Sequence, residues 1–223
     1  MIPLYDTQRG RGIPLVNLLL IGLNGLVFFY ELGLGSSGLE RFINLRGLVP
    51  ARFTADPVSP DVWVTFLSAM FIHGGWLHIL SNMWVLFIFG DNVESRMGGL
   101  GYLMFYVMSG IAAALLQIAL LPSSGVPMVG ASGAIAGVLG AYMLLFPRAR
   151  VVSLLPIFFI FTTVELPAVI FLLFWFVSQL FSGVMSLGGA TSSGIAWWAH
   201  IGGFIFGLVA VFFFARRPTH RTW

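Results

Sequence analysis

The sequence predicts an all-α, polytopic membrane protein in which six helices cross the bilayer. Of its 223 residues, 58% are hydrophobic and 9% are charged, and the mean hydropathy is +0.96. These values lie far outside the range of soluble globular domains. Windows of about twenty residues, the length that a helix needs to cross the hydrocarbon core, locate six apolar runs. The predicted spans are residues 13–34, 74–92, 100–121, 132–147, 165–182 and 195–215.

These spans form one membrane-embedded domain over residues 1–223, with its core at about 60–215. The first span follows two arginines and lacks a small-residue cleavage site, so we interpret it as a retained helix and not as a signal peptide. Residues 151–182 are too long an apolar run for one ordinary span. Pro156 and Pro167 therefore favour a bent or interfacial approach to the fifth helix.

The distribution of arginine predicts the orientation. Six spans place both termini on one side, and that side then holds eight arginines, against Arg41, Arg46 and Arg52 on the other. The positive-inside rule makes the termini, residues 1–12 and 216–223, short cytoplasmic tails. The minimal tails favour the plasma membrane of a prokaryote. The eight arginines are Arg9, Arg11, Arg96, Arg148, Arg150, Arg216, Arg217 and Arg221.

Composition also bounds the chemistry. The net charge of +3 is small and the arginines flank the apolar runs, so nucleic-acid binding has little support. The absence of cysteine excludes thiol catalysis and cysteine-ligated metals, and no zinc-binding spacing of histidines occurs. We expect no cofactor and no metal.

The loops on the outer side differ from one another. Residues 35–73, with Trp63 and Phe66, are too polar to span the membrane but apolar enough to lie partly in its interface, packed against the bundle. The loops at 121–131 and 183–194 carry no charge and are rich in Gly, Ser and Pro, which is typical of mobile segments.

Three polar residues share one predicted depth. His78, Ser132 and His200 each lie sixteen residues before the charged residue that ends their span, Glu94, Arg148 or Arg216. At 1.5 Å per residue, all three lie about 24 Å from the cytoplasmic boundary. Polar groups are costly in lipid, so each one is a candidate for function.

The fourth apolar run is too short to cross the membrane alone. Ser132 to Phe146 extends over about 22 Å, so the start of this helix must be sunken. The irregular segment Pro122–Val129 would then dip into the membrane, which is tolerated only beside a protein-enclosed or water-filled cavity. We expect such a cavity above Ser132, at a helix N-terminus that offers unpaired N–H groups.

Glycines at small-xxx-small spacing could bring Ser132 and His200 together. They allow close approach of helix backbones, although such repeats are also ordinary packing elements in membranes. His78 and Asn82, at i and i+4, share one helix face and could hold an oxyanion, but interhelical hydrogen bonding alone would also explain them. The glycines are Gly133, Gly137, Gly140, Gly203 and Gly207.

Three motifs on three spans resemble the signatures of rhomboid intramembrane serine proteases, in family order. They are Gly130-Ala131-Ser132-Gly133, His78-xxx-Asn82 and Ala199-His200-Ile-Gly-Gly203. The resemblance implies that Ser132 is the nucleophile and His200 its base. It assigns the oxyanion to His78, Asn82 and the Ser132 backbone N–H, with Gly130, Gly133 and Gly203 in support. It also implies a six-helix rhomboid-like bundle, a membrane-inserted first loop, and a substrate gate at helix five and the last outer loop.

Two departures from the family pattern concern the neighbours of the site. Trp63 is followed by Val64 where many relatives have arginine, and Ala136 stands where some have an aromatic residue that braces the base. Two other histidines, His73 and His220, fall in a loop and a tail, and we assign them no chemistry.

The expected function is an intramembrane serine endopeptidase. No carboxylate lies at the depth of Ser132, so Ser132 and His200 would act as a dyad through an acyl-enzyme, on transmembrane protein substrates near the outer interface. The alternative is a non-proteolytic rhomboid-like binder of membrane helices. A channel or transporter ranks third, because inverted repeats and membrane-centred charges are absent. The sequence is silent on oligomeric state and substrate identity.

Overall fold

The computed structural model describes residues 1–8, 10, 12–157, 160–187 and 194–216. Arg9, Arg11, Arg217, Arg221, His220 and residues 188–193 of the last outer loop lie outside the described residues. In chain order the elements are β1 (Ile2–Asp6), α1 (Leu15–Leu32), α2 (Gly35–Arg46), α3 (Pro50–Ala55), α4 (Pro60–Ser68), η1 (Ala69–Phe71), α5 (Trp76–Met97), α6 (Gly99–Leu120), α7 (Ser132–Leu145), β2 (Arg150–Ile157), β3 (Ile160–Pro167), α8 (Ala168–Leu187) and α9 (Trp197–Phe214).

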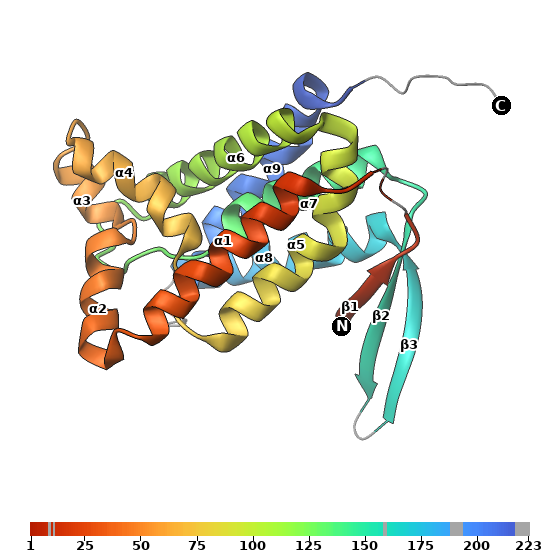
Figure 1. The fold of residues 1–223 in the computed structure, drawn as a ribbon, viewed down its shortest axis with the longest axis horizontal. Coiled ribbons are helices and arrows are strands. Elements are labelled where there is room, and N and C mark those ends of the chain that lie inside the picture. Colours follow the sequence, from red (N-terminus) through yellow and green to blue (C-terminus); the bar gives the residue numbers. More distant parts are fainter. Residues whose placement is uncertain (9, 11, 158–159, 188–193, 217–223) are drawn as a thin grey trace.

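Five long helices, α1, α5, α6, α8 and α9, and the shorter α7 form a bundle among the described residues (Figure 1). The helices α2, α3 and α4 gather at one end of it, and β1 and the end of α9 lie at the other (Figure 1). Among the described residues, α1, α6, α8 and α9 are each long and apolar enough to cross a membrane. The chain is therefore an integral membrane protein built as a helical bundle.

The count of six spans depends on two helices and stays a prediction. Helix α5 qualifies only together with Pro60–Phe71, from which it is bent by 81°. Helix α7 has only 14 residues, and it begins at Ser132 as predicted. The predicted boundaries of the other spans agree with the structure to within a few residues, except that α5 extends to Met97 and α8 to Leu187.

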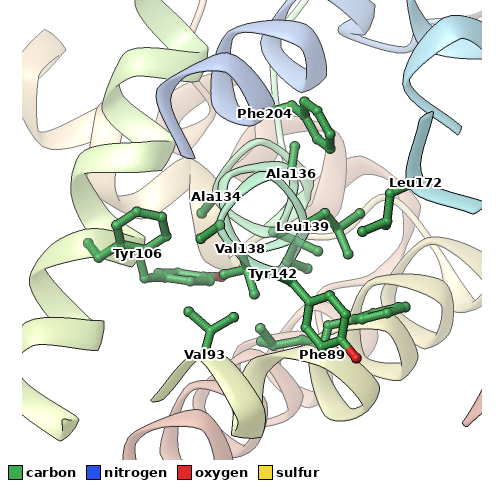
Figure 2. Close-up of a cluster of buried hydrophobic side chains, with 14 of the residues drawn as sticks. Phe89, Val93, Tyr106, Ala134, Ala136, Val138, Leu139, Tyr142, Leu172 and Phe204 are labelled. Carbon is green, nitrogen blue, oxygen red and sulfur yellow. The ribbon is translucent and has the colours of Figure 1, made fainter. Parts of the chain in front are cut away.

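Helix α7 occupies the centre of the bundle. Its small and apolar side chains radiate toward all its neighbours, with Phe204 of α9, Tyr106 of α6, Phe89 of α5 and Leu172 of α8 around it (Figure 2). Each of these four residues is at most 1% exposed. Residues 134–142 of α7 are all buried, so this part of the helix presents no face to lipid and the helix need not be as long as the membrane is thick.

The all-α prediction is wrong at the end of the bundle that carries the termini. Strands β1, β2 and β3 form an antiparallel sheet in that order, which projects from the helices (Figure 1). The apolar run at 151–164, before the predicted fifth span (α8), is thus a hairpin and not a bent approach. Part of the predicted tail 1–12 is strand β1. Pro167 ends β3 and α8 starts at Ala168, so the predicted helix start at 165 was three residues early. The run is rich in β-branched and aromatic residues, which favour strands.

The first loop covers the irregular segment that precedes α7. Leu48 and Met128 exchange two backbone hydrogen bonds, at 3.1 and 2.8 Å, and the Ala51 N–H donates to the Ser124 carbonyl at 3.0 Å. These contacts satisfy the backbone of a segment that would otherwise be costly in lipid. They tie the loop at 121–131 to the protein, where the sequence predicted a mobile segment.

Candidate active site

Ser132 and His200 meet between α7 and α9. Ser132 is the first residue of α7, and His200 lies in the first turn of α9. The His200 Nε2 atom lies 2.8 Å from the Ser132 Oγ atom, a normal hydrogen-bond distance. The predicted proximity of the Ser132 hydroxyl and the His200 imidazole is confirmed. From this arrangement an imidazole can remove a serine proton.

The glycine stripes place the two helix backbones in direct contact. A Cβ atom added to Gly203 would overlap the carbonyl oxygen of Gly133, and one added to Gly207 would overlap that of Gly137. Gly140 is likewise pressed against the carbonyl of Phe204. No side chain separates the helices, so the short serine side chain reaches the imidazole. The stripes therefore face each other, as predicted.

The turn before Ser132 is held from the first loop. Gly130 has a φ of +114°, a conformation that side chains disfavour. Its N–H donates to the Ala69 carbonyl at 2.8 Å, which anchors the turn to η1. Because Ser132 begins the helix, its own N–H has no acceptor within α7 and points away from the helix end.

The two side chains predicted as oxyanion donors, His78 and Asn82, have different surroundings. The His78 ring lies against Gly130, where an added Cβ would meet its Nε2 and Cε1 atoms, so this side chain borders the approach to Ser132. The Asn82 side-chain amide is 6% exposed and donates one hydrogen to the His78 carbonyl of its own helix, at 2.8 Å. Its second amide hydrogen is not used in that bond.

His73 is more than a loop residue. It is fully buried, and its backbone N–H donates to both carboxylate oxygens of Glu31, at 3.0 and 3.2 Å. Its ring packs edge-on against His78, with centroids 4.9 Å apart. Glu31 therefore fixes the segment that supports His78, and this link between α1 and the segment before α5 was not predicted.

His200 has neighbours that the sequence analysis missed. Its Nδ1 atom lies 2.7 Å from Oε1 of Gln179 on α8. Trp175 and Trp197 lie beside the ring, with centroid distances of 6.1 and 6.0 Å. These tryptophans flank the imidazole, and Ala136 has no ring that could do so. The signal was available, because a glutamine inside an apolar span is as unusual as the serine.

A small cavity opens beside Ser132. Its volume is about 40 Å³, and Met70, Gly110, Ala113 and Ala199 are among the residues around it. A water molecule needs about 10 to 15 Å³ of such space. The predicted cavity at the start of α7 is therefore present. Among the described residues, no group of three His, Asp or Glu side chains is placed to hold a metal ion.

Comparison with known proteins gives a consistent result. A family model described as Rhomboid domain matches residues 60–217. The chain is 33% identical to Rhomboid-like protein 11, chloroplastic, of Arabidopsis thaliana over 51% of this chain and 39% of that protein. It is 31% identical to RHOMBOID-like protein 4 of the same plant, over 74% of this chain and 37% of the relative. It is 33% identical to Rhomboid-type serine protease 2 of Emericella nidulans, over 43% of this chain and 19% of that protein.

Proposed function

The chain belongs to the rhomboid family, and we propose that it is an intramembrane serine endopeptidase. The observation that carries the proposal is the 2.8 Å contact between Ser132 Oγ and His200 Nε2 inside a membrane bundle. One relative is named as a serine protease. The chain spans less than two fifths of the length of the relatives described above, so its activity is inferred from its own residues.

The contact supports a dyad mechanism. His200 accepts the hydroxyl proton as Ser132 Oγ attacks a peptide carbonyl, and the imidazolium then protonates the leaving amine. Water, admitted through the cavity beside Ser132, gives its proton to His200 and hydrolyses the ester. The second step regenerates the serine and releases the new carboxyl end of the substrate.

The oxyanion of the tetrahedral intermediate needs donors on the other side of the reacting carbon. The Ser132 N–H at the start of α7 is one donor. His78 and the second amide hydrogen of Asn82 are the others that we propose, because His78 lies against Gly130 and Asn82 follows one turn later on the same face of α5. Loss of one such donor typically lowers the rate by about 10² to 10³.

The substrates that we propose are transmembrane segments with Gly, Pro or other weak helix formers near the outer interface. A peptide bond inside a stable helix hides its carbonyl in the helical hydrogen bonds, so the segment must unwind locally before Ser132 can attack. Rhomboid-like protein 11 is named as chloroplastic, and another relative, of Saccharomyces cerevisiae, is named as mitochondrial. These names lend no support to the prokaryotic plasma membrane that the sequence favoured, and the proposal is limited to an integral membrane enzyme.

A labelling experiment tests the nucleophile. A fluorophosphonate should modify Ser132 in the purified protein, as located by mass spectrometry, and the Ser132→Ala variant should lose both labelling and cleavage of a model transmembrane substrate. Ser95→Ala is the matched control, because its hydroxyl donates only to the Asn92 carbonyl at the other end of α5. Cleavage that survives Ser132→Ala would remove Ser132 from the mechanism.

The alternative is a rhomboid-like binder of membrane helices without proteolytic activity. It predicts that the parent protein captures the model substrate in detergent micelles without cleaving it and that fluorophosphonate leaves Ser132 unmodified. The intact Ser132–His200 hydrogen bond favours the enzyme, because a binder has no need of it.

A further inference from the structure

Gln179 is a buried amide at the site that the dyad mechanism leaves without a role. It lies on α8, is 7% exposed, and directs its Oε1 atom at His200 Nδ1 over 2.7 Å. The helix around it is mostly apolar and largely faces outward, with Phe174 63% and Phe181 69% exposed. A buried amide that loses its hydrogen-bond partner costs free energy. A polar side chain turned inward from such a helix therefore stays with its partner.

The orientation of this amide is determined by its other neighbours. The Ser178 hydroxyl donates to the Trp175 carbonyl at 2.6 Å, so the Ser178 oxygen is left to accept. Gln179 Nε2 donates to that oxygen at 3.1 Å and toward the same carbonyl at 3.4 Å. A flipped amide would set its oxygen against the carbonyl oxygen of Trp175. The side that faces His200 must therefore be the acceptor oxygen.

From this geometry we infer that Gln179 is a positioning residue for the base, an inference that rests on the proposed function. An acceptor at Nδ1 requires the proton of the neutral imidazole to be on Nδ1. The lone pair then lies on Nε2, which faces the Ser132 hydroxyl. The opposite tautomer would present an N–H to Ser132 and could not take its proton.

A neutral amide does this task differently from a carboxylate. It fixes the ring and the tautomer through one hydrogen bond, and it keeps accepting that bond when the imidazolium forms. It adds no negative charge, so no unpaired carboxylate is buried in the membrane. The arrangement couples the base to α8, because neither α7 nor α9 provides an acceptor for Nδ1 in the described structure.

The first test uses Gln179→Met, which keeps the length of the side chain and removes the acceptor. We expect kcat to fall about 10- to 100-fold with KM nearly unchanged, because general-base catalysis is weakened and substrate contacts are not. Fluorophosphonate labelling of Ser132 should slow by a similar factor. Ser178→Ala is the comparison variant: it removes the Ser178 hydroxyl and both of its hydrogen bonds, but the Trp175 carbonyl still faces the Gln179 amide nitrogen and the acceptor at His200 Nδ1 stays, so kcat should fall less than fivefold.

The second test uses Gln179→Glu, which restores an acceptor and adds a charge. We expect it to recover most of the activity lost in Gln179→Met and to move the acidic limb of the kcat/KM pH profile to higher pH, since a carboxylate stabilises the imidazolium. If Gln179 only filled space, Gln179→Glu would be no more active than Gln179→Met, and the acidic limb of its kcat/KM pH profile would not move.

A third measurement does not depend on any variant folding. Nitrogen NMR of the full chain with labelled histidine should show the His200 proton on Nδ1 in the parent protein. A proton on Nε2, or a Gln179→Met variant with the kcat and pH profile of the parent, would overturn the role of Gln179. Failure of the parent to label at Ser132 would instead overturn the proposed function, so the two failures are distinguishable.

Discussion

Two sides of the site are built in opposite ways. The α7–α9 side is a seam of backbone against backbone, in which Gly203 and Gly207 leave no room for a methyl group. The α8 side is a helix with large apolar residues turned outward. In its most apolar stretch 28% of the residues are buried, against 44% in α9. Yet α8 supplies Gln179, the hydrogen-bond partner of the base.

The difference separates two requirements of the chemistry. The distance between nucleophile and base is set by the seam, which can change only if helix backbones separate. The state of the base is set by a side chain on the more exposed helix, which can move with less loss of packing. On the proposed mechanism, a substrate that entered beside α8 would disturb the tautomer of His200 before it disturbed the distance to Ser132.

The largest expected effect comes from breaking the seam. In Gly207→Ala the added methyl would overlap the Gly137 carbonyl, and Gly137 Cα and its carbonyl carbon also lie within 2.9 Å of it. Only a backbone shift can relieve this overlap. We expect a loss of about 3 kcal/mol in the free energy of unfolding, the upper end for overpacked cores. Cleavage should fall as well, since His200 lies two turns away on the same helix.

Gly25→Ala on α1 is the control for this variant. An added Cβ at Gly25 meets nothing within 4 Å, and alanine is favoured over glycine within a helix by about 0.5 to 1 kcal/mol. Unfolding in mixed micelles, followed by helical circular dichroism, measures both variants. If Gly207→Ala were as stable as Gly25→Ala, the two sides of the site would not differ as described.

A smaller effect is expected from two positions of α8. Leu172 is fully buried against α7, whereas Phe174 on the same helix is 63% exposed. Leu172→Ala should lower the free energy of unfolding by about 2 kcal/mol, the low end for a buried leucine, because lipid reduces the cost of exposing apolar surface. Phe174→Ala should change it by less than about 0.5 kcal/mol. Equal losses at both positions would mean that both sides of α8 are packed.

The smallest expected effect is on the pH dependence of stability. It concerns the end of α7 away from Ser132, where this helix is joined to the sheet. Asp6 of β1 accepts hydrogen bonds from Tyr142 of α7 and from Asn92 Nδ2 at 3.0 Å. Burial raises the pKa of Asp6 from 3.8 to about 6, and the nearby Asp91 adds to this rise, against the hydrogen bond from Tyr142. The folded protein thus holds this proton more tightly than the unfolded chain does.

The sign of the pH dependence follows from that difference. The contribution of Asp6 to stability is fully present below pH 4 and is lost as the pH rises to about 6. Allowing for partial exposure, the loss is about 1 to 2 kcal/mol. The change in unfolding free energy between pH 4 and pH 7 should be smaller in Asp6→Asn than in the parent by this amount. A parent and variant with the same pH dependence would contradict the role of Asp6.

Local signals in the sequence, together with the resemblance of three motifs, predicted the bundle and the meeting of Ser132 with His200. Both side chains are polar interruptions of apolar runs, and the glycine spacing allowed the two helix faces to touch. The same rule applied to Gln179 would have found it, since it interrupts the run at 165–182. The difference is that Ser132 and His200 belong to motifs and Gln179 stands alone.

The sheet was not predictable from periodicity. A short apolar strand cannot be distinguished by its pattern from a helical segment, and residues 151–164 have no strict alternation of polar and apolar residues. The partner that completes the sheet is distant, because Ile2 pairs with Leu154. His73 was missed for a related reason. Its backbone N–H donates to Glu31, which is forty-two residues earlier in the chain.

The pairing of β1 with β2 also has a consequence for biosynthesis. Ile2 leaves the ribosome long before Leu154 exists, and at about 5 to 20 residues per second the delay is roughly 8 to 30 seconds. During that time α1 enters the membrane while the strand before it has no hydrogen-bonding partner. Strand β1 is thus translated before α1 but reaches its final position only after the hairpin emerges, and until then it must be kept from pairing with other nascent chains.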